Sequence, residues 1–283
     1  MATDPQLRLM TERTSASDSP KIAVRGVSHA FADRNGNVLP TLNRVTLDVA
    51  AGEFVSIVGP SGSGKSTLLN VISGLLVPDE GEIAIDGLRV RGIQRNIGYM
   101  PSRDALLPWR TVLGNVEFGL ELKGMRVEER RLAAVEMIQA VNLSGFERHY
   151  PGELSSGMRQ RVAIARIFAT SPEILLMDEP FSALDAQTRL RAQSLFLQLW
   201  EARRITVLFV THDVGEAIAL SDRIVVFSSR PASLLAELRI PFKRPRDVRR
   251  LNATSEYQRL FSDVFELLDT SDASPESPTG GLE

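Results

Sequence analysis

A glycine-rich turn at residues 59–67 constrains the fold of this chain more than any other stretch. The apolar run at 53–58 predicts a buried strand before the turn, and residues 67–74 predict a helix after it. Glycines at positions 59, 62 and 64 allow backbone conformations in which successive N–H groups point toward one anion. The helix N-terminus supplies further N–H donors at the same place. This order of strand, turn and helix predicts a P-loop that binds a nucleoside triphosphate.

Every residue of this turn is expected to contact the nucleotide. Lys65 would neutralise charge on the terminal phosphates, a catalytic role, and the Ser66 hydroxyl would be a ligand of Mg²⁺. A chance glycine-rich turn is the alternative, and the flanking strand and helix argue against it. The expected nucleotide-binding residues are Gly59, Pro60, Ser61, Gly62, Ser63, Gly64, Lys65, Ser66 and Thr67.

Composition excludes several classes of protein. The 283 residues carry a net charge of −2, so no basic field predicts a nucleic-acid partner. The chain has no cysteine, which excludes disulfides, thiolate zinc sites and cysteine nucleophiles. The first twenty residues lack the apolar segment of a signal peptide, and no apolar run is long enough to span a bilayer. We therefore expect a soluble or peripheral protein that binds no nucleic acid.

Strand and helix patterns alternate after the turn, which predicts an α/β fold built on a parallel sheet. Strands are also predicted before the turn, at 22–27 and 45–49. Helical periodicity from 111 to 141 predicts a helical insertion at about 101–157.

Both ends of the chain are polar and show no periodicity. Residues 1–20 are rich in Ser, Thr and Asp, and residues 269–283 are rich in Ser, Pro and acidic side chains. Such segments cannot bury enough apolar surface to fold, so we predict disorder there. The folded domain is accordingly expected at 21–268.

An acidic pair follows the apolar run at 174–177. Asp178 is expected at the carboxyl end of a strand beside the P-loop strand, where α/β sheets bind ligands, and would hold Mg²⁺ together with Ser66. Glu179 would take a proton from the water that attacks the γ-phosphate. A charged turn after a strand is the alternative, and the pairing with a P-loop makes it the weaker one.

His212 follows another apolar strand, at 206–210. At that place an imidazole could contact the γ-phosphate and report its presence. A lone histidine after a strand is usually structural, so this hypothesis depends on the neighbouring motifs. His29 and His149 have no such context and are predicted to be ordinary.

A second anion-binding turn is predicted at 154–157, where the residues form the N-terminus of a helix. One triphosphate does not need two such turns. A symmetric head-to-tail dimer, in which this turn of each subunit covers the partner's nucleotide, would explain why the chain has both.

Taken together, these motifs resemble the ATP-binding subunit of an ABC transporter, over residues 22–268. The order and spacing of five pieces carry the resemblance: the P-loop 59–67, the signature-like 154–158, the run 174–179, the D-loop 182–185 and His212. The family implies ATP and Mg²⁺ as ligands, an N-terminal antiparallel β subdomain and a helical insertion. It also implies nucleotide contacts from Phe31, which would stack on adenine, and from Ser155, Ser156, Gly157 and Asp185.

Two further stretches, 104–112 and 240–247, resemble those of importers of nitrate, sulfonate, taurine and related solutes. The resemblance implies an ATPase on the cytoplasmic face of the inner membrane. Its partners would be a second copy of itself and permease subunits, and indirectly a solute-binding protein. An ATPase of another machine, such as an exporter or a lipoprotein extractor, is one alternative. A slow or inert assembly module is the other.

Two positions depart from the family pattern. Ser102 stands where a glutamine usually contacts Mg²⁺ or the attacking water, and a serine would need a bridging water or a neighbour such as Asp104. Ser156 stands where the signature has a glycine, so it must either tolerate the local backbone conformation or strain it. Both departures concern hydrolysis and coupling more than nucleotide binding.

Two surface segments each allow two interpretations. Residues 105–110, with Trp109, form either a docking patch for the permease or ordinary packing beneath the insertion. The basic residues between 239 and 250 form either a solvated loop, the favoured interpretation, or a contact with anionic lipid.

Overall fold

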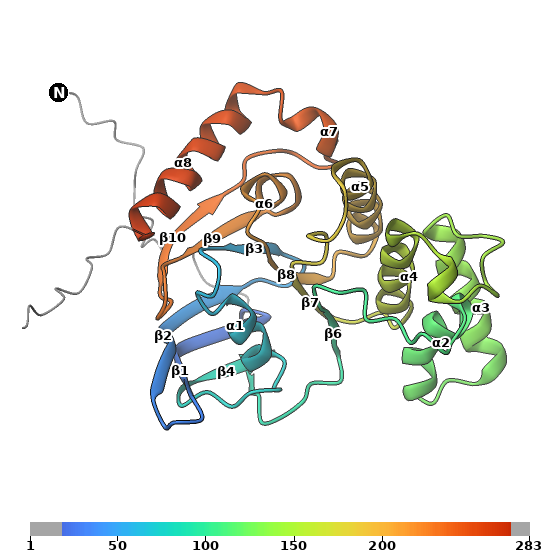
Figure 1. Cartoon of the computed structure of the whole chain (residues 1–283), viewed down its shortest axis with the longest axis horizontal. Helices are drawn as coiled ribbons and strands as arrows, with labels where there is room; N and C mark the ends of the chain where they lie inside the picture. The colour runs from blue at the N-terminus through green and yellow to red at the C-terminus, as the bar shows by residue number, and fades with distance from the viewer. Residues whose placement is uncertain (1–18, 273–283) are drawn as a thin grey trace, which may run out of the picture.

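The computed structural model describes residues 19–272, which form an α/β protein with two sheets (Figure 1). Residues 1–18 and 273–283 lie outside the described part, so the disorder predicted there stays a prediction. The predicted fold class, a P-loop core with a parallel sheet, an antiparallel β subdomain and a helical insertion, is confirmed.

The larger sheet has six strands in the order β10-β9-β3-β8-β7-β6. Neighbouring strands are parallel except β10 and β9, which are antiparallel. The strands are β10 (Leu234–Arg239), β9 (Arg223–Phe227), β3 (Phe54–Val58), β8 (Thr206–Val210), β7 (Ile174–Asp178) and β6 (Ile97–Met100).

One expectation about this sheet is wrong. The sequence pattern predicts the strand that ends in Asp178, β7, beside the P-loop strand β3, but β8 lies between them and pairs with both. The central strands are all mostly apolar, so their composition predicts burial but carries no information on their order.

Side chains of the central strands alternate between two buried layers. In β7, Ile174 and Leu176 pack on the side of the first helix, α1 (Lys65–Ile72), whereas Leu175 and Met177 pack on the opposite side. Because both faces are covered, the carboxyl ends of these strands are held rigidly at one edge of the sheet.

The smaller sheet is antiparallel and lies on the α1 side (Figure 1). Its strands, in spatial order, are β2 (Val38–Val49), β1 (Ile22–Ala32), β4 (Glu80–Ile85) and β5 (Leu88–Arg89). The first two strands extend further than the predicted 22–27 and 45–49. Irregularities in register between Val24 and Ala30 break the simple alternation on which the prediction relied, while pairing continues past them.

The predicted insertion contains α2 (Val112–Leu122) and α3 (Val127–Ala140), followed by the short turn η1 (Pro151–Glu153). The next helix, α4 (Ser156–Ala169), packs against both α2 and α3. These helices form a lobe at one side of the sheet (Figure 1). The remaining helices are α5 (Ala186–Arg203), α6 (Val214–Leu220), α7 (Val248–Leu251) and α8 (Ser255–Asp272).

Helix α8 passes the boundary predicted at 268 and continues to Asp272, so residues 269–272 are helical rather than part of a disordered tail. Leu267 and Leu268 pack against the buried cluster formed by α6 and β9, which holds the last turns of the helix. None of the described helices is long and apolar enough to cross a bilayer.

The basic segment after β10 is not uniformly solvated. The side chains of Arg244 and Arg246 are only 8% and 1% exposed. Arg246 donates to the Ser221 carbonyl oxygen at 2.6 Å and Arg244 to the Leu220 carbonyl oxygen at 2.6 Å, at the C-terminus of α6. These two arginines therefore anchor the segment to the fold and are not available to lipid.

Candidate nucleotide site

The glycine-rich turn connects β3 to α1, as predicted. Gly62 and Gly64 have φ angles of +73° and +112°, in the region that favours glycine. A Cβ on Gly64 would also lie 2.9 Å from the Thr41 carbonyl oxygen. The N-terminus of α1 is thus packed tightly against β2, and a side chain at position 64 would separate them.

Lys65 occupies the interior of this turn. Its residue is 5% exposed, and its Nζ donates to the carbonyl oxygens of Gly59 at 2.8 Å and Pro60 at 2.7 Å. Burial lowers the pKa of Lys65, while the charges of Glu179 and Asp178 raise it. A buried ammonium is stabilised by a neighbouring anion, and the phosphate of a nucleotide is one.

Ser63 gives a second indication that an anion belongs here. The residue is 1% exposed, and its Oγ has no hydrogen-bond partner among the described residues. A buried hydroxyl without a partner costs free energy. A phosphate oxygen beside it would accept the missing hydrogen bond, so the turn fits a triphosphate.

Ser66 and Asp178 meet although they lie far apart in the sequence. The Ser66 Oγ donates to Asp178 Oδ1 at 2.9 Å. Burial raises the pKa of the Asp178 carboxyl, and the hydrogen bond from Ser66 opposes this shift. A cation would offset the burial cost of the charged form.

A hydroxyl and one carboxylate are hard oxygen ligands of the kind that Mg²⁺ takes together with phosphate oxygens and water. The described residues contain no cluster of three or more His, Cys, Asp or Glu side chains that could hold a metal. The Ser66–Asp178 pair fits Mg²⁺ bound together with a nucleotide.

Glu179 and His212 form the next pair. The Nδ1 atom of His212 lies 3.0 Å from Glu179 Oε2. Glu179 has a left-handed backbone, with φ at +45°, and its N–H donates to the Val210 carbonyl oxygen at 2.9 Å. The His212 side chain remains 56% exposed, so its outer ring nitrogen is open to a ligand at the same sheet edge.

The predicted second anion-binding turn lies at the start of α4. Ser155 is the N-cap, and its Oγ accepts from the Met158 N–H at 3.3 Å. In Figure 1, strands β7 and β8 separate α4 from α1, so the two predicted anion-binding turns of one chain do not share a ligand. Asp185, the N-cap of α5, accepts from the Thr188 N–H at 3.0 Å, and its hydrogen bonds lower the pKa of its carboxyl.

The structure decides between the two alternatives for Ser156. Ser156 is the first residue of α4 and is absent from the positive-φ residues of the described chain, so it carries no left-handed strain. The following Gly157 is the constrained position, because a Cβ there would lie 2.4 Å from Thr188 Cγ2.

Ser102 is exposed in the loop between β6 and α2. No hydrogen bond joins its side chain to Ser66 or Asp178 within residues 19–272. Asp104, the neighbour expected to replace the missing glutamine, accepts from Arg159 Nε of α4 at 2.9 Å instead. The proposed magnesium role of Ser102 therefore lacks a contact that supports it, and Asp104 connects the loop to α4.

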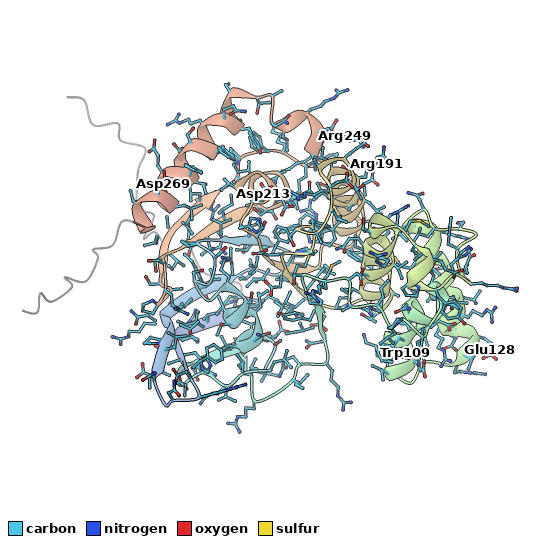
Figure 2. The ribbon with its side chains drawn as sticks, viewed as in Figure 1. Trp109, Glu128, Arg191, Asp213, Arg249 and Asp269 are labelled. Atoms are coloured by element: carbon cyan, nitrogen blue, oxygen red, sulfur yellow. The ribbon has the colours of Figure 1, made fainter. Side chains whose placement is uncertain are left out.

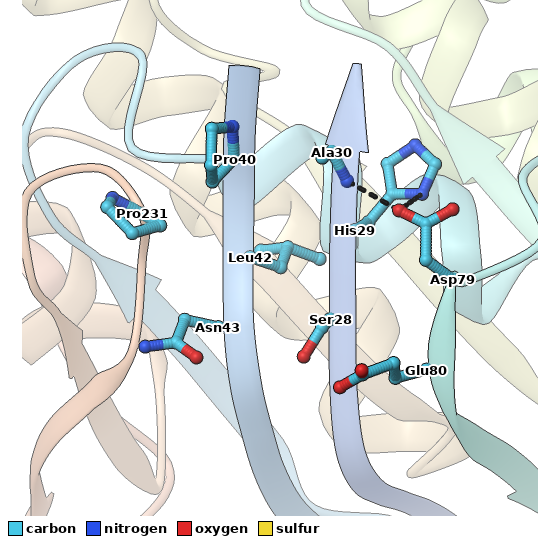
Figure 3. Close-up of a pocket in the computed structure, with 9 residues that line it drawn as sticks. All are labelled: Ser28, His29, Ala30, Pro40, Leu42, Asn43, Asp79, Glu80 and Pro231. Carbon is cyan, nitrogen blue, oxygen red and sulfur yellow. Dashed lines mark hydrogen bonds and ion pairs between the residues drawn. The ribbon is translucent and has the colours of Figure 1, made fainter. Parts of the chain in front are cut away.

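Phe31 lies near the end of β1 and is 41% exposed. The His29 ring packs edge-on against it, with ring centroids 4.7 Å apart. His29 also lines a hollow of about 450 Å³ between β1, β2 and β4, where Asp79 accepts from the Ala30 N–H at 2.7 Å (Figure 3). An exposed aromatic ring at this place is compatible with stacking on a base.

The 105–110 segment contains both an exposed residue and a packed one, so exposure keeps the docking interpretation for Trp109 as a proposal. Trp109 is 73% exposed on the surface of the helical lobe (Figure 2). Leu106 instead packs against the buried cluster of that lobe. Buried Asn115 fixes the segment, because it accepts from the Leu107 N–H at 2.8 Å and donates to the Arg110 carbonyl oxygen at 2.9 Å.

Sequence reasoning missed Gln160. The buried Gln160 Nε2 of α4 donates to the Pro180 carbonyl oxygen at 2.7 Å, one residue after Glu179. This contact connects the Ser155–Gly157 turn with the Glu179 turn. A glutamine on the apolar face of a helix was the available signal, since a buried amide needs a partner.

Comparison with known proteins agrees with this geometry. A model of the ABC transporter family matches residues 42–182. An uncharacterised ABC transporter ATP-binding protein, MJ0412 of Methanocaldococcus jannaschii, is 49% identical over 227 residues, which cover 80% of this chain and 85% of that protein. The taurine import ATP-binding protein TauB of Yersinia pestis is 44% identical over 216 residues, covering 76% and 84%. TauB of Rhizobium johnstonii is 40% identical over 253 residues, covering 87% and 97%.

Solved structures show the same architecture. The dimeric structure of a post-hydrolysis state of the ATP-binding cassette MJ0796, bound to ADP and phosphate, superposes with a TM-score of 0.69 at 36% identity. The superposition covers 78% of this chain and all of that one.

Proposed function

Because this chain belongs to the ABC transporter family and is one of its ATP-hydrolysing subunits, we propose that it drives import of a small solute of the taurine, sulfonate or nitrate kind. The observation that carries the proposal is the match to two taurine import ATP-binding proteins over 84% and 97% of their lengths. The chemistry rests on the residues that meet at the carboxyl edge of the large sheet.

The proposed reaction is hydrolysis of ATP to ADP and phosphate by in-line attack of water. Backbone N–H groups of the 59–67 turn and the Lys65 ammonium hold the β- and γ-phosphates and balance their charge. Glu179 accepts a proton from the attacking water as the bond to phosphorus forms, and ADP leaves with the electron pair of the broken bond. His212, hydrogen-bonded to Glu179, faces the γ-phosphate and keeps that carboxylate oriented.

The Ser66 hydroxyl and the Asp178 carboxylate, whose oxygens lie 2.9 Å apart, would both be ligands of Mg²⁺. When bound, the ion would neutralise charge on the β- and γ-phosphates. Phe31 would stack on the adenine ring.

A second copy of the chain supplies what one copy lacks. In Figure 1, β7 and β8 lie between α1 and α4, the helix that begins at the Ser155–Gly157 turn, so a head-to-tail dimer would place this turn over the partner's nucleotide, with Asp185 at the same seam. The two dimeric structures of the MJ0796 cassette support the formation of a dimer. ATP would then draw two subunits together, and hydrolysis would release them.

Transport requires membrane-spanning subunits. The exposed Trp109 on the helical lobe is the proposed contact with a permease, and a solute-binding protein would deliver the cargo to that permease. We therefore place the subunit as a peripheral protein on the cytoplasmic face of the inner membrane. Export or lipoprotein extraction is the second candidate function. The relative MJ0412, which is 49% identical to this chain, is uncharacterised, so its name gives no direction of transport.

Reconstitution with the permease and binding protein tests the proposal. Proteoliposomes should take up labelled taurine, an alkanesulfonate or nitrate only when MgATP is on the side of this subunit. Movement of solute away from the binding-protein side would show an exporter, and no phosphate release with the complete complex would show an inert assembly module.

The dimer is tested separately with Glu179→Gln. This variant should bind ATP while its turnover falls by about 100-fold or more, and light scattering should show a dimer in MgATP. Monomers under saturating MgATP would contradict the shared site, and turnover at the parent rate would contradict the role of Glu179.

A further inference from the structure

A cluster of polar side chains, three of them buried and two partly exposed, connects α5 and α6 to the turns that carry Glu179 and His212. It comprises Arg189 and Gln193 of α5, Thr211 and Asp213 around His212, and Glu216 of α6. Asp213, the N-cap of α6, is labelled in Figure 2. None of these side chains is assigned a role in the hydrolysis described above.

Arg189 contacts two turns at once. Its Nη2 donates to the Leu184 carbonyl oxygen at 3.0 Å, and its Nη1 donates to Asp213 Oδ2 at 3.4 Å. Its Nε lies 3.9 Å from Glu216 Oε1. Leu184 belongs to the turn after Glu179, whereas Asp213 follows His212, so one guanidinium spans both.

Glu216 of α6 holds the His212 turn through the neighbouring Thr211. This residue is 5% exposed, its Oε2 accepts from the Thr211 hydroxyl at 2.7 Å, and its Oε1 accepts from Gln193 Nε2 at 2.9 Å. Thr211 Oγ1 in turn accepts from the Asp213 N–H at 3.0 Å. The residues on both sides of His212 are therefore tied to α5 and α6, and a buried carboxylate with these partners resists rearrangement.

The other turn is tied to Glu179. Ser182 donates to the Glu179 carbonyl oxygen through its N–H at 3.2 Å and through its Oγ at 2.9 Å. A displacement of residues 182–185 would thus move the Glu179 backbone. Within residues 19–272 the His212 side chain hydrogen-bonds to Glu179, so the distance between the two depends on how the two turns are held.

We propose that Arg189 is a positioning residue that holds the Glu179 turn and the His212 turn in register, and acts on hydrolysis through His212. The inference rests on the proposed role of His212. Through Arg189, a shift of the 182–185 turn, which the proposed dimer places at the subunit interface, would also move Glu179 and His212 relative to each other.

Arg189→Ala, with Arg191→Ala as the matched control, tests the inference. Arg191 is exposed on the same helix, so its loss removes a guanidinium from α5 without touching either turn. We expect Arg189→Ala to lower kcat by about tenfold or more while KM for MgATP changes by less than about twofold. Arg191→Ala should leave both constants near those of the parent. Equal kcat values for the two variants would overturn the inference.

A double-mutant cycle separates positioning from general stabilisation. In a His212→Ala background, Arg189→Ala should lower kcat by less than about twofold further, because its effect passes through His212. An equal loss in both backgrounds would overturn the inference. Arg189→Lys keeps the charge but cannot span both turns, so it should resemble Arg189→Ala in kcat and the parent in melting temperature. If Arg189→Lys has the kcat of the parent, simultaneous contact with both turns is not required and the inference is wrong.

The outcome for His212→Ala alone distinguishes a failure of the proposed function from a failure of the Arg189 proposal. If that variant turns over at the parent rate, the proposed role of His212 fails and the inference fails with it. If it loses activity while Arg189→Ala does not, only the inference fails.

Discussion

The His212 Nδ1 lies 3.0 Å from Glu179 Oε2, although 33 residues separate them. Two features of the backbone produce this approach. Parallel β7 and β8 are neighbours and end at the same edge, and the left-handed turn at Glu179 directs its side chain across that edge. The pair therefore depends on the sheet as much as on the two side chains.

His212→Ala should lower kcat by about 100-fold while leaving the melting temperature unchanged, because the imidazole is more than half exposed and its hydrogen-bond partner is the proposed general base. Phosphate release and differential scanning calorimetry measure the two effects. His149→Ala is the control histidine, with parent kcat expected. A similar loss in both variants would contradict a specific role for His212.

Gly157→Ala should lower kcat, whereas Ser156→Gly should change neither kcat nor stability by much. The added methyl at position 157 would lie 2.4 Å from Thr188 Cγ2, so either the Thr188 side chain rotates or α4 and α5 separate, and we expect kcat to fall about tenfold or more. Ser156 has no left-handed backbone, so glycine there should change the free energy of unfolding by at most about 1 kcal/mol. Urea unfolding and phosphate release check both. A marked gain in stability or activity from Ser156→Gly would show that the serine is strained.

Glu216→Gln should change how stability depends on pH. Burial raises the pKa of Glu216, so the native state keeps its proton at pH values where the unfolded chain, with a pKa of about 4.3, has lost it. The unfolded state then binds fewer protons, and this group lowers the free energy of unfolding as pH rises through its native pKa. The glutamine variant lacks this loss, so its stability relative to the parent should increase from pH 4 toward neutrality.

Urea unfolding at a series of pH values measures this difference. Exposed Glu128→Gln on α3 is the control for loss of one carboxylate (Figure 2). A constant difference between Glu216→Gln and the parent at all pH values would contradict the raised pKa.

Trp109→Ala should weaken assembly with the permease and leave the isolated subunit intact. The side chain is 73% exposed and lies on the helical lobe, so little buried packing is lost. We expect about tenfold weaker co-purification or binding, with an unchanged melting temperature. Val77→Ala, 79% exposed and outside that lobe, is the matched control. Equal assembly by both variants would place the docking surface elsewhere.

Arg246→Ala should lower the free energy of unfolding by about 3 kcal/mol, because it leaves buried carbonyl groups at the end of α6 without their donor. Burial lowers the pKa of Arg246 to about 10. Because this value is still well above 7, the side chain is charged at neutral pH. Exposed Arg249→Ala should cost less than about 0.5 kcal/mol. Equal unfolding midpoints for the two variants would show that the Arg246 contacts do not stabilise the fold.

The local sequence pattern was enough to predict most helices and strands and the individual motifs. The 59–67 turn, the strand at 206–210 and the apolar run at 174–177 that leads into Asp178 are where the residues predict them, because flanking apolar runs and turn residues act within a few positions. Short α6 and edge strand β10 were not predicted, since neither has enough residues to show a clear period.

The sequence by itself determined the P-loop, the buried strands and the family, since each depends on residues that are contiguous or regularly spaced. Only the tertiary structure decided that β8 separates β7 from β3, that Ser156 is unstrained while Gly157 lies too close to Thr188 for a Cβ, and that Arg246 is buried. It also brought Arg189 to both the Glu179 turn and the His212 turn. The physical reason is that these outcomes depend on how whole elements pack, and packing joins residues whose separation along the chain leaves no local signal.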